Sequence, residues 1–203
     1  MKRKDVGLLV LRLTTGGLMA GHGAQKLFGA FGGHGLEGTK GFMESLGLRP
    51  ASRWAALAGL SEFGGGVLTA LGLLNPLGPI GIISAMTMAA RTAHRGKPIW
   101  GTAGGAELPV TNISAALALA LAGPGRYSLD NALGLRLPQP LVGLAAAGAA
   151  GGVYLGLTQA QAAATEAKSD EPAQAETPRE QEQPGRDEQQ AEPSPDLAEA
   201  LAF

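Results

Sequence analysis

Long apolar stretches rich in glycine and alanine dominate the first 158 residues and restrict the fold of this chain more than any other feature. A helix crosses the apolar core of a bilayer with about 20 predominantly apolar residues. The stretch 140–157 has no charged residue, and the stretch 54–74 has one, Glu62. Further stretches of this kind cover residues 6–27, 76–90 and 108–122. We therefore expect an all-α, polytopic membrane helix bundle with four core transmembrane helices and a fifth at 140–157.

A soluble protein with buried helices is the alternative fold class. Helices of soluble proteins present a charged face at every turn, but residues 67–90 and 141–157 contain no charge. Gly inside a soluble helix costs about 1 kcal/mol relative to Ala, whereas small residues let membrane helices approach closely. The membrane bundle is therefore favoured. The glycines expected to serve close approach are Gly16, Gly17, Gly21, Gly59, Gly64, Gly65, Gly66, Gly143, Gly148 and Gly152.

The start of the chain resembles a signal peptide, because basic residues at 2–4 precede an apolar run. Arg12 interrupts that run, however, and no A-x-A cleavage site precedes His22, so we expect a retained first helix. The basic cluster favours a cytoplasmic N-terminus, although two later loops on the opposite side also carry basic residues. A fifth span would place the C-terminal tail opposite the N-terminus.

Charge divides the chain into two parts that the average properties hide. The net charge is −1 and the mean hydropathy +0.09. Residues 1–158 carry thirteen basic and six acidic residues, whereas residues 159–203 carry three basic and eleven acidic ones. We expect a four-helix bundle at 1–135, an additional transmembrane helix at 136–158 and an acidic tail at 159–203. The tail has too few large apolar residues to offset its ordering entropy, so we expect it to be disordered.

Two details of the tail stay open at this point. Residues 161–168 are expected to continue the last helix for a short distance. The last eight residues, 196–203, have the spacing of one apolar turn that docks a partner, but a solvated tail without a role in activity is the favoured interpretation.

Ionisable residues inside the expected spans are costly, by roughly 2.5–3.5 kcal/mol on insertion scales. Glu62 lies in the middle of its stretch, where it must pair with a cation or be protonated. At 100° per residue, His22 and Lys26 lie about 80° and 40° from Arg12 around the first helix, so the three share one face. We expect an intramembrane polar site formed by Arg12, His22, Lys26 and Glu62. A structural ion pair, and an Arg12 that reaches back to the interface, are the competing interpretations.

Three further residues lie near the expected membrane faces. Arg91 and His94 end the third stretch, and Glu107 precedes the fourth. They are candidates for the rim of a polar cavity, although ordinary interfacial residues are slightly favoured. The chain has no Cys, and its three His residues lack metal-ligand spacing, so we expect no metal site and no covalently bound cofactor.

The loop after the first stretch contains its own apolar periodicity over residues 36–46. This spacing predicts a short amphipathic helix on the membrane surface or over the end of the bundle. Capping of the bundle is the preferred interpretation.

Several motifs, taken as an ordered set, resemble the DoxX-like family of small bacterial membrane proteins. The segments are 21–28 (GHGAQKLF), 31–38 (FGGHGLEG), 59–66 (GLSEFGGG), 104–109 (GGAELP) and 123–130 (GPGRYSLD). The resemblance covers about residues 5–135 and implies a four-helix bundle in the bacterial plasma membrane, related to a subunit of thiosulfate:quinone oxidoreductase. It also implies a link to thiol-oxidative stress and places the family's polar positions at Arg12, His22, Lys26, Glu62 and Glu107.

Three classes of function remain open. The first is a membrane subunit or partner of a quinone-linked redox system, with quinone as the candidate ligand and a soluble oxidoreductase as the partner that supplies electrons. The second is a proton-coupled carrier of small solutes, which would require a homo-oligomer because the chain shows no inverted repeat. The third is a non-catalytic scaffold. The lipid bilayer is the expected surrounding in each case, nucleic acid is not an expected partner, and the chain is at most a subunit of an enzyme.

Overall fold

The computed structural model describes residues 3–169, which are helical apart from turns and connecting loops, with no strand in that range. The predictions for residues 170–203, including the turn at 196–203, lie outside the described residues. The elements are α1 (Arg3–Phe28), η1 (Ala30–Gly32), α2 (Gly35–Ser45), α3 (Ala51–Leu71), α4 (Leu77–Arg91), η2 (Gly101–Ala103), α5 (Glu107–Ala122), α6 (Leu129–Leu133) and α7 (Gln139–Ser169).

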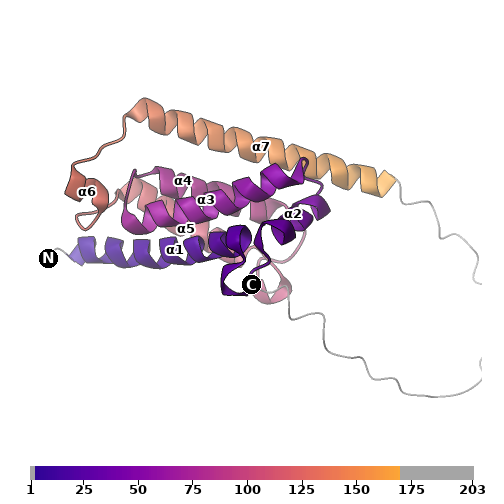
Figure 1. Ribbon diagram of the computed structural model, residues 1–203, viewed down its shortest axis with the longest axis horizontal. Helices are drawn as coiled ribbons and strands as arrows, with labels where there is room; N and C mark the ends of the chain where they lie inside the picture. The colour runs from indigo at the N-terminus through magenta and orange to yellow at the C-terminus, as the bar shows by residue number, and fades with distance from the viewer. Residues whose placement is uncertain (1–2, 170–203) are drawn as a thin grey trace, which may run out of the picture.

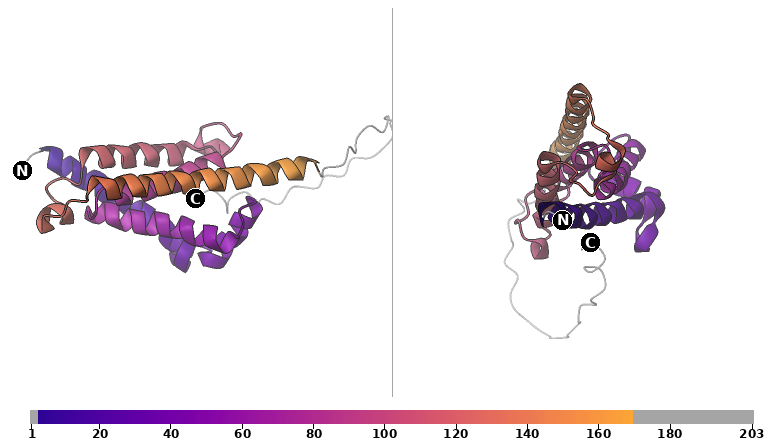
Figure 2. Two further views of the ribbon diagram at one scale, coloured as in Figure 1. Left: turned by 90° about the horizontal axis from the view of Figure 1, so that it is seen from above. Right: turned by 90° about the vertical axis from the view of Figure 1, so that its left-hand side faces the viewer.

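Four helices, α1, α3, α4 and α5, lie side by side as an antiparallel bundle, and α7 runs along its outside (Figures 1 and 2). We call the end at which α1 begins the N-terminal end; it also holds the α3–α4 turn, α6 and the start of α7. The opposite end, called the loop end, holds α2, the start of α3, the α4–α5 connection and the end of α7 (Figure 1). The all-α class predicted from the sequence is confirmed.

Glycines bring α1 and α3 into backbone contact. A Cβ atom at Gly16 would collide with the backbone of Ala70, and one at Gly66 would collide with the backbone of Ala20. Gly23 lies in the same way against the backbone of Phe63. Small residues at a helix interface permit this approach, and it is the packing expected of membrane helices. Other glycines named above have open space where a Cβ would lie and bring no two helices of this chain together. They are Gly17, Gly21, Gly64, Gly143, Gly148 and Gly152.

The interior of the bundle is small and built from apolar side chains of different helices. One cluster joins Met19 of α1, Ile82 and Met86 of α4, and Ala116 of α5. A second cluster, at the loop end, joins α2 to the start of α3 through Met43, Leu48, Ala51 and Ala55. The expected helix at 36–46 is therefore present as α2, and it packs on the end of the bundle, as the capping interpretation predicted.

Within residues 3–169, two helices are long and apolar enough to cross a membrane, α3 and α7. The helices α4 and α5 are apolar but have 15 and 16 residues, which gives about 23 Å at 1.5 Å per residue, less than the roughly 30 Å of a hydrocarbon core. The helix α1 has 26 residues but includes Arg12, His22 and Lys26. Four core spans therefore remain a prediction.

The last helix is longer than the expected stretch 140–157. It spans 31 residues, about 46 Å, and continues without a break through the domain boundary expected at 158. The continuation expected at 161–168 is present. Its apolar side chains, such as Leu144 and Tyr154, are largely exposed, because the rest of the chain covers little of its surface. In a helix of this composition, such a surface is suited to lipid.

Candidate functional site

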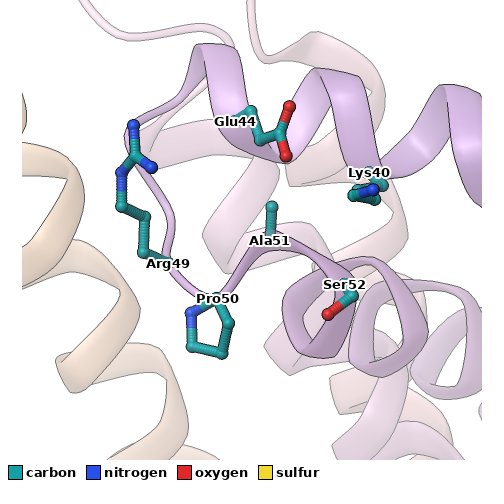
Figure 3. Close-up of a pocket in the computed structure, with 6 residues that line it drawn as sticks. All are labelled: Lys40, Glu44, Arg49, Pro50, Ala51 and Ser52. Carbon is teal, nitrogen blue, oxygen red and sulfur yellow. The ribbon is translucent and has the colours of Figure 1, made fainter.

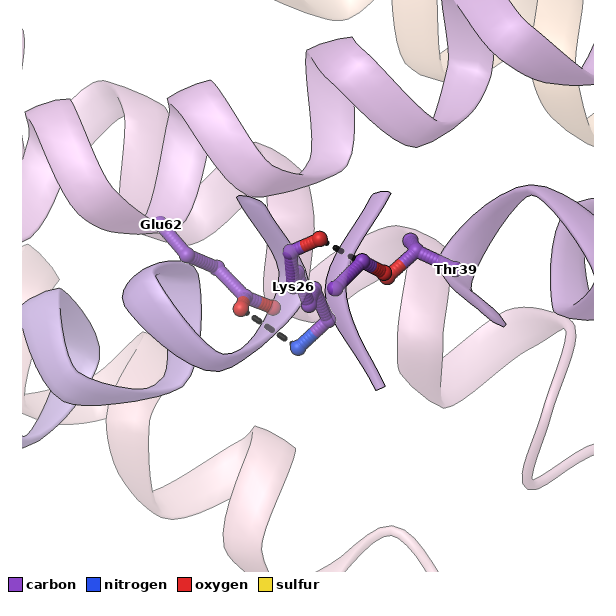
Figure 4. Close-up of polar contacts among 4 residues, drawn as sticks. Lys26, Thr39 and Glu62 are labelled. Carbon is purple, nitrogen blue, oxygen red and sulfur yellow. Dashed lines mark hydrogen bonds and ion pairs between the residues drawn. The ribbon is translucent and has the colours of Figure 1, made fainter. Parts of the chain in front are cut away.

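The clearest candidate site is an ion pair between α1 and α3. Lys26 Nζ lies 2.5 Å from Glu62 Oε2 (Figure 4). The Glu62 side chain is 5 % exposed, whereas that of Lys26 is 30 % exposed. The bundle thus encloses the Glu62 carboxylate, whereas the Lys26 ammonium is partly exposed at the protein surface. Of Arg12 and Lys26, the two cations of the expected polar site, the structure pairs Lys26 with Glu62.

Local sequence explains why this pair can form in an apolar bundle. Gly23 and Gly59 lie one turn before Lys26 and Glu62, respectively, and both face the opposing helix closely: Gly23 lies against the Phe63 backbone and Gly59 against the Leu27 side chain. These close contacts bring the two helices near enough for a salt bridge. Burial of two charges is costly unless they are paired, so the pair depends on this close packing.

The helix α2 holds the outer part of the site. The Thr39 hydroxyl lies 3.1 Å from the backbone carbonyl oxygen of Lys26 and 2.8 Å from that of Gly35 (Figure 4). Thr39 is itself buried. Phe28, two residues after Lys26, is 67 % exposed and meets the Phe63 ring edge-to-face, with 5.4 Å between the ring centroids. An aromatic surface therefore adjoins the ion pair.

Arg12 lies elsewhere in the bundle. It precedes Lys26 by fourteen residues, about 21 Å along α1, and its Nη2 donates a hydrogen bond of 2.6 Å to the carbonyl oxygen of Tyr127 at the N-terminal end. The residue is 2 % exposed, and its guanidinium lies against Gly72, beyond the end of α3. Arg12 thus reaches toward the N-terminal end but stays enclosed by protein.

A residue that the sequence analysis did not single out, Asp130, completes this second polar region. Its carboxylate accepts hydrogen bonds of 2.8 Å from the backbone N–H groups of Leu74 and Asn75. These two hydrogen bonds connect α6 to the α3–α4 turn, close to Arg12. Asp130 belongs to the motif segment 123–130. The sequence signal that could have identified it is Ser128, a typical helix N-cap residue two positions earlier, whose Oγ caps α6.

The remaining candidates lie toward the loop end. His22 is half-buried on α1, one turn before Lys26. His94 Nδ1 lies 2.7 Å from the carbonyl oxygen of Gly104, and Glu107 accepts a hydrogen bond of 2.8 Å from the N–H of Gly101. Both contacts lie within the α4–α5 connection or at its ends. Arg91, three residues before His94, is exposed. These contacts join neither His94 nor Glu107 to the Lys26–Glu62 pair.

An open hollow of about 500 Å³ lies at the start of α3, lined by Lys40, Glu44, Arg49, Pro50, Ala51 and Ser52 (Figure 3). Ala51 precedes Glu62 by eleven residues, about 16 Å along the helix. The hollow is therefore separate from the ion pair. We regard the ion pair as the better candidate for chemistry, because the hollow is shallow and open to solvent whereas Glu62 is enclosed.

A buried carboxylate next to a half-exposed ammonium is able to perform two tasks. The ammonium donates hydrogen bonds to an acceptor oxygen, and the carboxylate exchanges a proton with a bound molecule. Neither task requires a metal, and no group of three or more His, Cys, Asp or Glu residues in the range 3–169 is arranged to hold one.

These features define a membrane-associated helical protein: a small-residue bundle with two helices of spanning length and an enclosed ion pair. Residues 7–95, somewhat less than half of the chain, match the family model of DoxX, and this match supports a DoxX-like assignment. The match covers α1 to α4 and includes Arg12, His22, Lys26, Glu62, Arg91 and His94. The motif segments 104–109 and 123–130, with Glu107, lie beyond it. The comparisons with curated proteins and with solved structures returned no significant match.

Proposed function

We propose that this protein is a multi-pass plasma-membrane subunit or partner of a quinone-linked redox system that responds to thiol-oxidative stress, and that Lys26 and Glu62 form its quinone-headgroup site. The observation that carries this proposal is the enclosed Lys26–Glu62 pair. An ionisable pair inside a membrane bundle is costly, and in membrane proteins such residues commonly mark ligand or proton pathways.

The chemistry follows from the two side chains. Reduction of a quinone to a quinol adds two electrons and two protons, and each carbonyl oxygen becomes a hydroxyl. The Lys26 ammonium is suited to donate a hydrogen bond to one such oxygen, and Glu62 is suited to relay a proton to it. The exposed ring of Phe28 offers a planar apolar contact for a headgroup that approaches from the membrane.

Electrons must come from a partner in this proposal. The sequence contains no Cys, and no glycine fingerprint for a dinucleotide follows a strand within residues 3–169, so its own side chains do not suggest a redox centre. A soluble oxidoreductase docked at one end of the bundle would supply them. A proton-coupled carrier remains an alternative use of the same carboxylate, and a scaffold remains an alternative that does not use it.

The first experiment is to purify the tagged protein from its native membrane in mild detergent and to identify the proteins and quinone that accompany it. The proposal predicts quinone in near-stoichiometric amount and a soluble oxidoreductase. A matched pair of variants gives the control: Glu62→Gln should lose the quinone, whereas Glu37→Gln, which alters the exposed Lys40–Glu37 pair, should retain it. Quinone at the level of unrelated membrane proteins would contradict the proposal.

A further inference from the structure

The loop end of the bundle carries a set of exposed cations without ion-pair partners. The structure has two salt bridges within the described residues, Lys26–Glu62 and Lys40–Glu37. Neither includes the five exposed basic residues of the loop end, which we call the basic surface: Arg49, Arg53, Arg91, Arg95 and Lys97. Three acidic residues of α2 and α5 lie at this end. Glu37 lies beside Lys40, Glu107 accepts from the Gly101 N–H, and Glu44 lines the same hollow as Arg49 without a salt bridge to it, so one of these three carboxylates, against five cations, has no other partner within residues 3–169.

The helix α7 carries the chain past this surface. Gln159 Oε1 accepts hydrogen bonds from the Trp54 indole N–H, at 3.0 Å, and from the Arg49 backbone N–H, at 3.2 Å. One turn earlier, Gly156 lies directly against Trp54 and Met88. Arg53 adjoins Trp54 in sequence and Arg91 follows Met88 by three residues. The C-terminal half of α7 is therefore anchored to the start of α3 and to α4, the helices that carry Arg49, Arg53 and Arg91 at or near their loop ends, and its last residues point beyond the loop end (Figure 1).

The sequence that follows α7 has the opposite charge. Residues 170–203 contain ten acidic and two basic residues, a net charge of −8. A chain of that length can span up to about 110 Å when fully extended, so its length does not prevent a return to the basic surface. Individual exposed ion pairs contribute little, but a segment with many carboxylates can engage several arginines together.

We propose that the acidic segment 170–203 docks on the basic surface of the same chain. This docking is supported by charge complementarity, by the cations that have no salt bridge within residues 3–169, and by the place where α7 ends. It does not depend on the quinone chemistry proposed above.

Anionic lipid headgroups are the principal competitor for the same surface, since basic residues at the end of membrane helices also attract them. Ion pairs at an exposed surface are screened by salt, with a screening length of about 10 Å at 0.1 M and about 3 Å at 1 M. Salt and lipid charge are therefore the two variables that test the proposal.

The chain has no Cys, so pairs of cysteines can be introduced into the full-length protein for cross-linking with a short bismaleimide. Ser52→Cys places one thiol beside the basic surface, and Ser194→Cys places the other in the acidic segment. The control pairs Ser194→Cys with Ala132→Cys, which is exposed at the N-terminal end. In nanodiscs of zwitterionic lipid, we expect the first pair to cross-link at least about fivefold more than the control at low salt, and to lose this excess near 1 M salt.

A charge variant provides the second arm. Replacement of Arg49, Arg53, Arg91 and Arg95 by Gln should remove the excess cross-linking at low salt. High salt should have the same effect on the cysteine pair when these arginines are kept. A cross-link that persists in high salt and in this variant would overturn the proposal. So would a cross-link that falls to the control level when anionic lipid replaces zwitterionic lipid, because the surface would then belong to the membrane.

Discussion

Lys26 Nζ and Glu62 Oε2 lie 2.5 Å apart across the interface at which glycines bring α1 and α3 into contact. The pair therefore depends on the close packing of two helices, and the packing accommodates a charge that an apolar interior would otherwise exclude.

Removal of Lys26 alone should destabilise the protein more than removal of both partners. Lys26→Met leaves Glu62 enclosed without its cation, and loss of one partner of a buried pair costs up to about 3–5 kcal/mol. The double variant Lys26→Met/Glu62→Gln avoids the unpaired charge. We expect a coupling of about 1–3 kcal/mol in a double-mutant cycle measured by unfolding in detergent.

The exposed pair Lys40–Glu37 supplies the control for that cycle. Its N–O distance is 3.6 Å and its carboxylate is 86 % exposed. Solvent screens such a pair, so its coupling should stay below about 0.5 kcal/mol. Equal couplings for the two cycles would show that the Lys26–Glu62 pair is not enclosed as described.

The interface of α1 and α3 should not tolerate a single added methyl group at Gly66. A Cβ at this position would collide with the backbone of Ala20, so Gly66→Ala should force the helices apart and cost about 1–3 kcal/mol. Gly64→Ala is the matched control, because a Cβ there meets nothing within 4 Å. It should be neutral or stabilising by up to about 1 kcal/mol, as Ala favours the helix. Thermal unfolding of both variants in the same detergent distinguishes these outcomes.

The anchor of α7 should depend on Gln159. Gln159→Leu removes the acceptor for both the Trp54 indole and the Arg49 backbone. Loss of hydrogen bonds of this kind costs about 1 kcal/mol each, so amide exchange in the C-terminal half of α7 should accelerate. Gln161→Leu, at an exposed position two residues later, should leave exchange unchanged. Equal exchange in the two variants would argue against the anchor.

The N-terminal end should depend on Asp130. Its carboxylate accepts two backbone N–H bonds at the α3–α4 turn and lies near the enclosed guanidinium of Arg12. Asp130→Asn keeps the shape but removes the charge and one acceptor oxygen. Hydrogen bonds to charged groups contribute about 1.5–3 kcal/mol, and we expect a loss of that size in the free energy of unfolding. Asn131→Ala, one residue on and exposed, should have a smaller effect because its side chain donates one neutral bond to the Arg126 carbonyl.

Much of the fold could be predicted from the sequence, because long uncharged stretches have few alternatives to helix. Periodicity located α2, and composition located α3 and the start of α7. The boundaries were less predictable: α3 ends at Leu71 because Gly72 adopts φ 62°, and α7 continues to Ser169 because Ala and Gln extend a helix after the apolar stretch ends.

The candidate site was predictable only in part. The helical angle placed Arg12, His22 and Lys26 on one face, but an angle does not give position along the axis, and the 21 Å between Arg12 and Lys26 separates them into two regions. The partner of Arg12 is a backbone carbonyl, Tyr127, for which a sequence gives no residue-type signal. Which glycines contact another helix also required the structure, since Gly64 and Gly66 are indistinguishable by type.

The role of the Lys26–Glu62 pair is tested by comparing Glu62→Gln with Glu37→Gln in cells that lack the native protein and are exposed to a thiol oxidant. Both changes remove one carboxylate charge, but only Glu62 belongs to the enclosed pair. With equal amounts of each variant in the membrane, the account predicts that Glu37→Gln restores oxidant resistance and that Glu62→Gln does not. Full resistance with Glu62→Gln would contradict a functional role for the Lys26–Glu62 site.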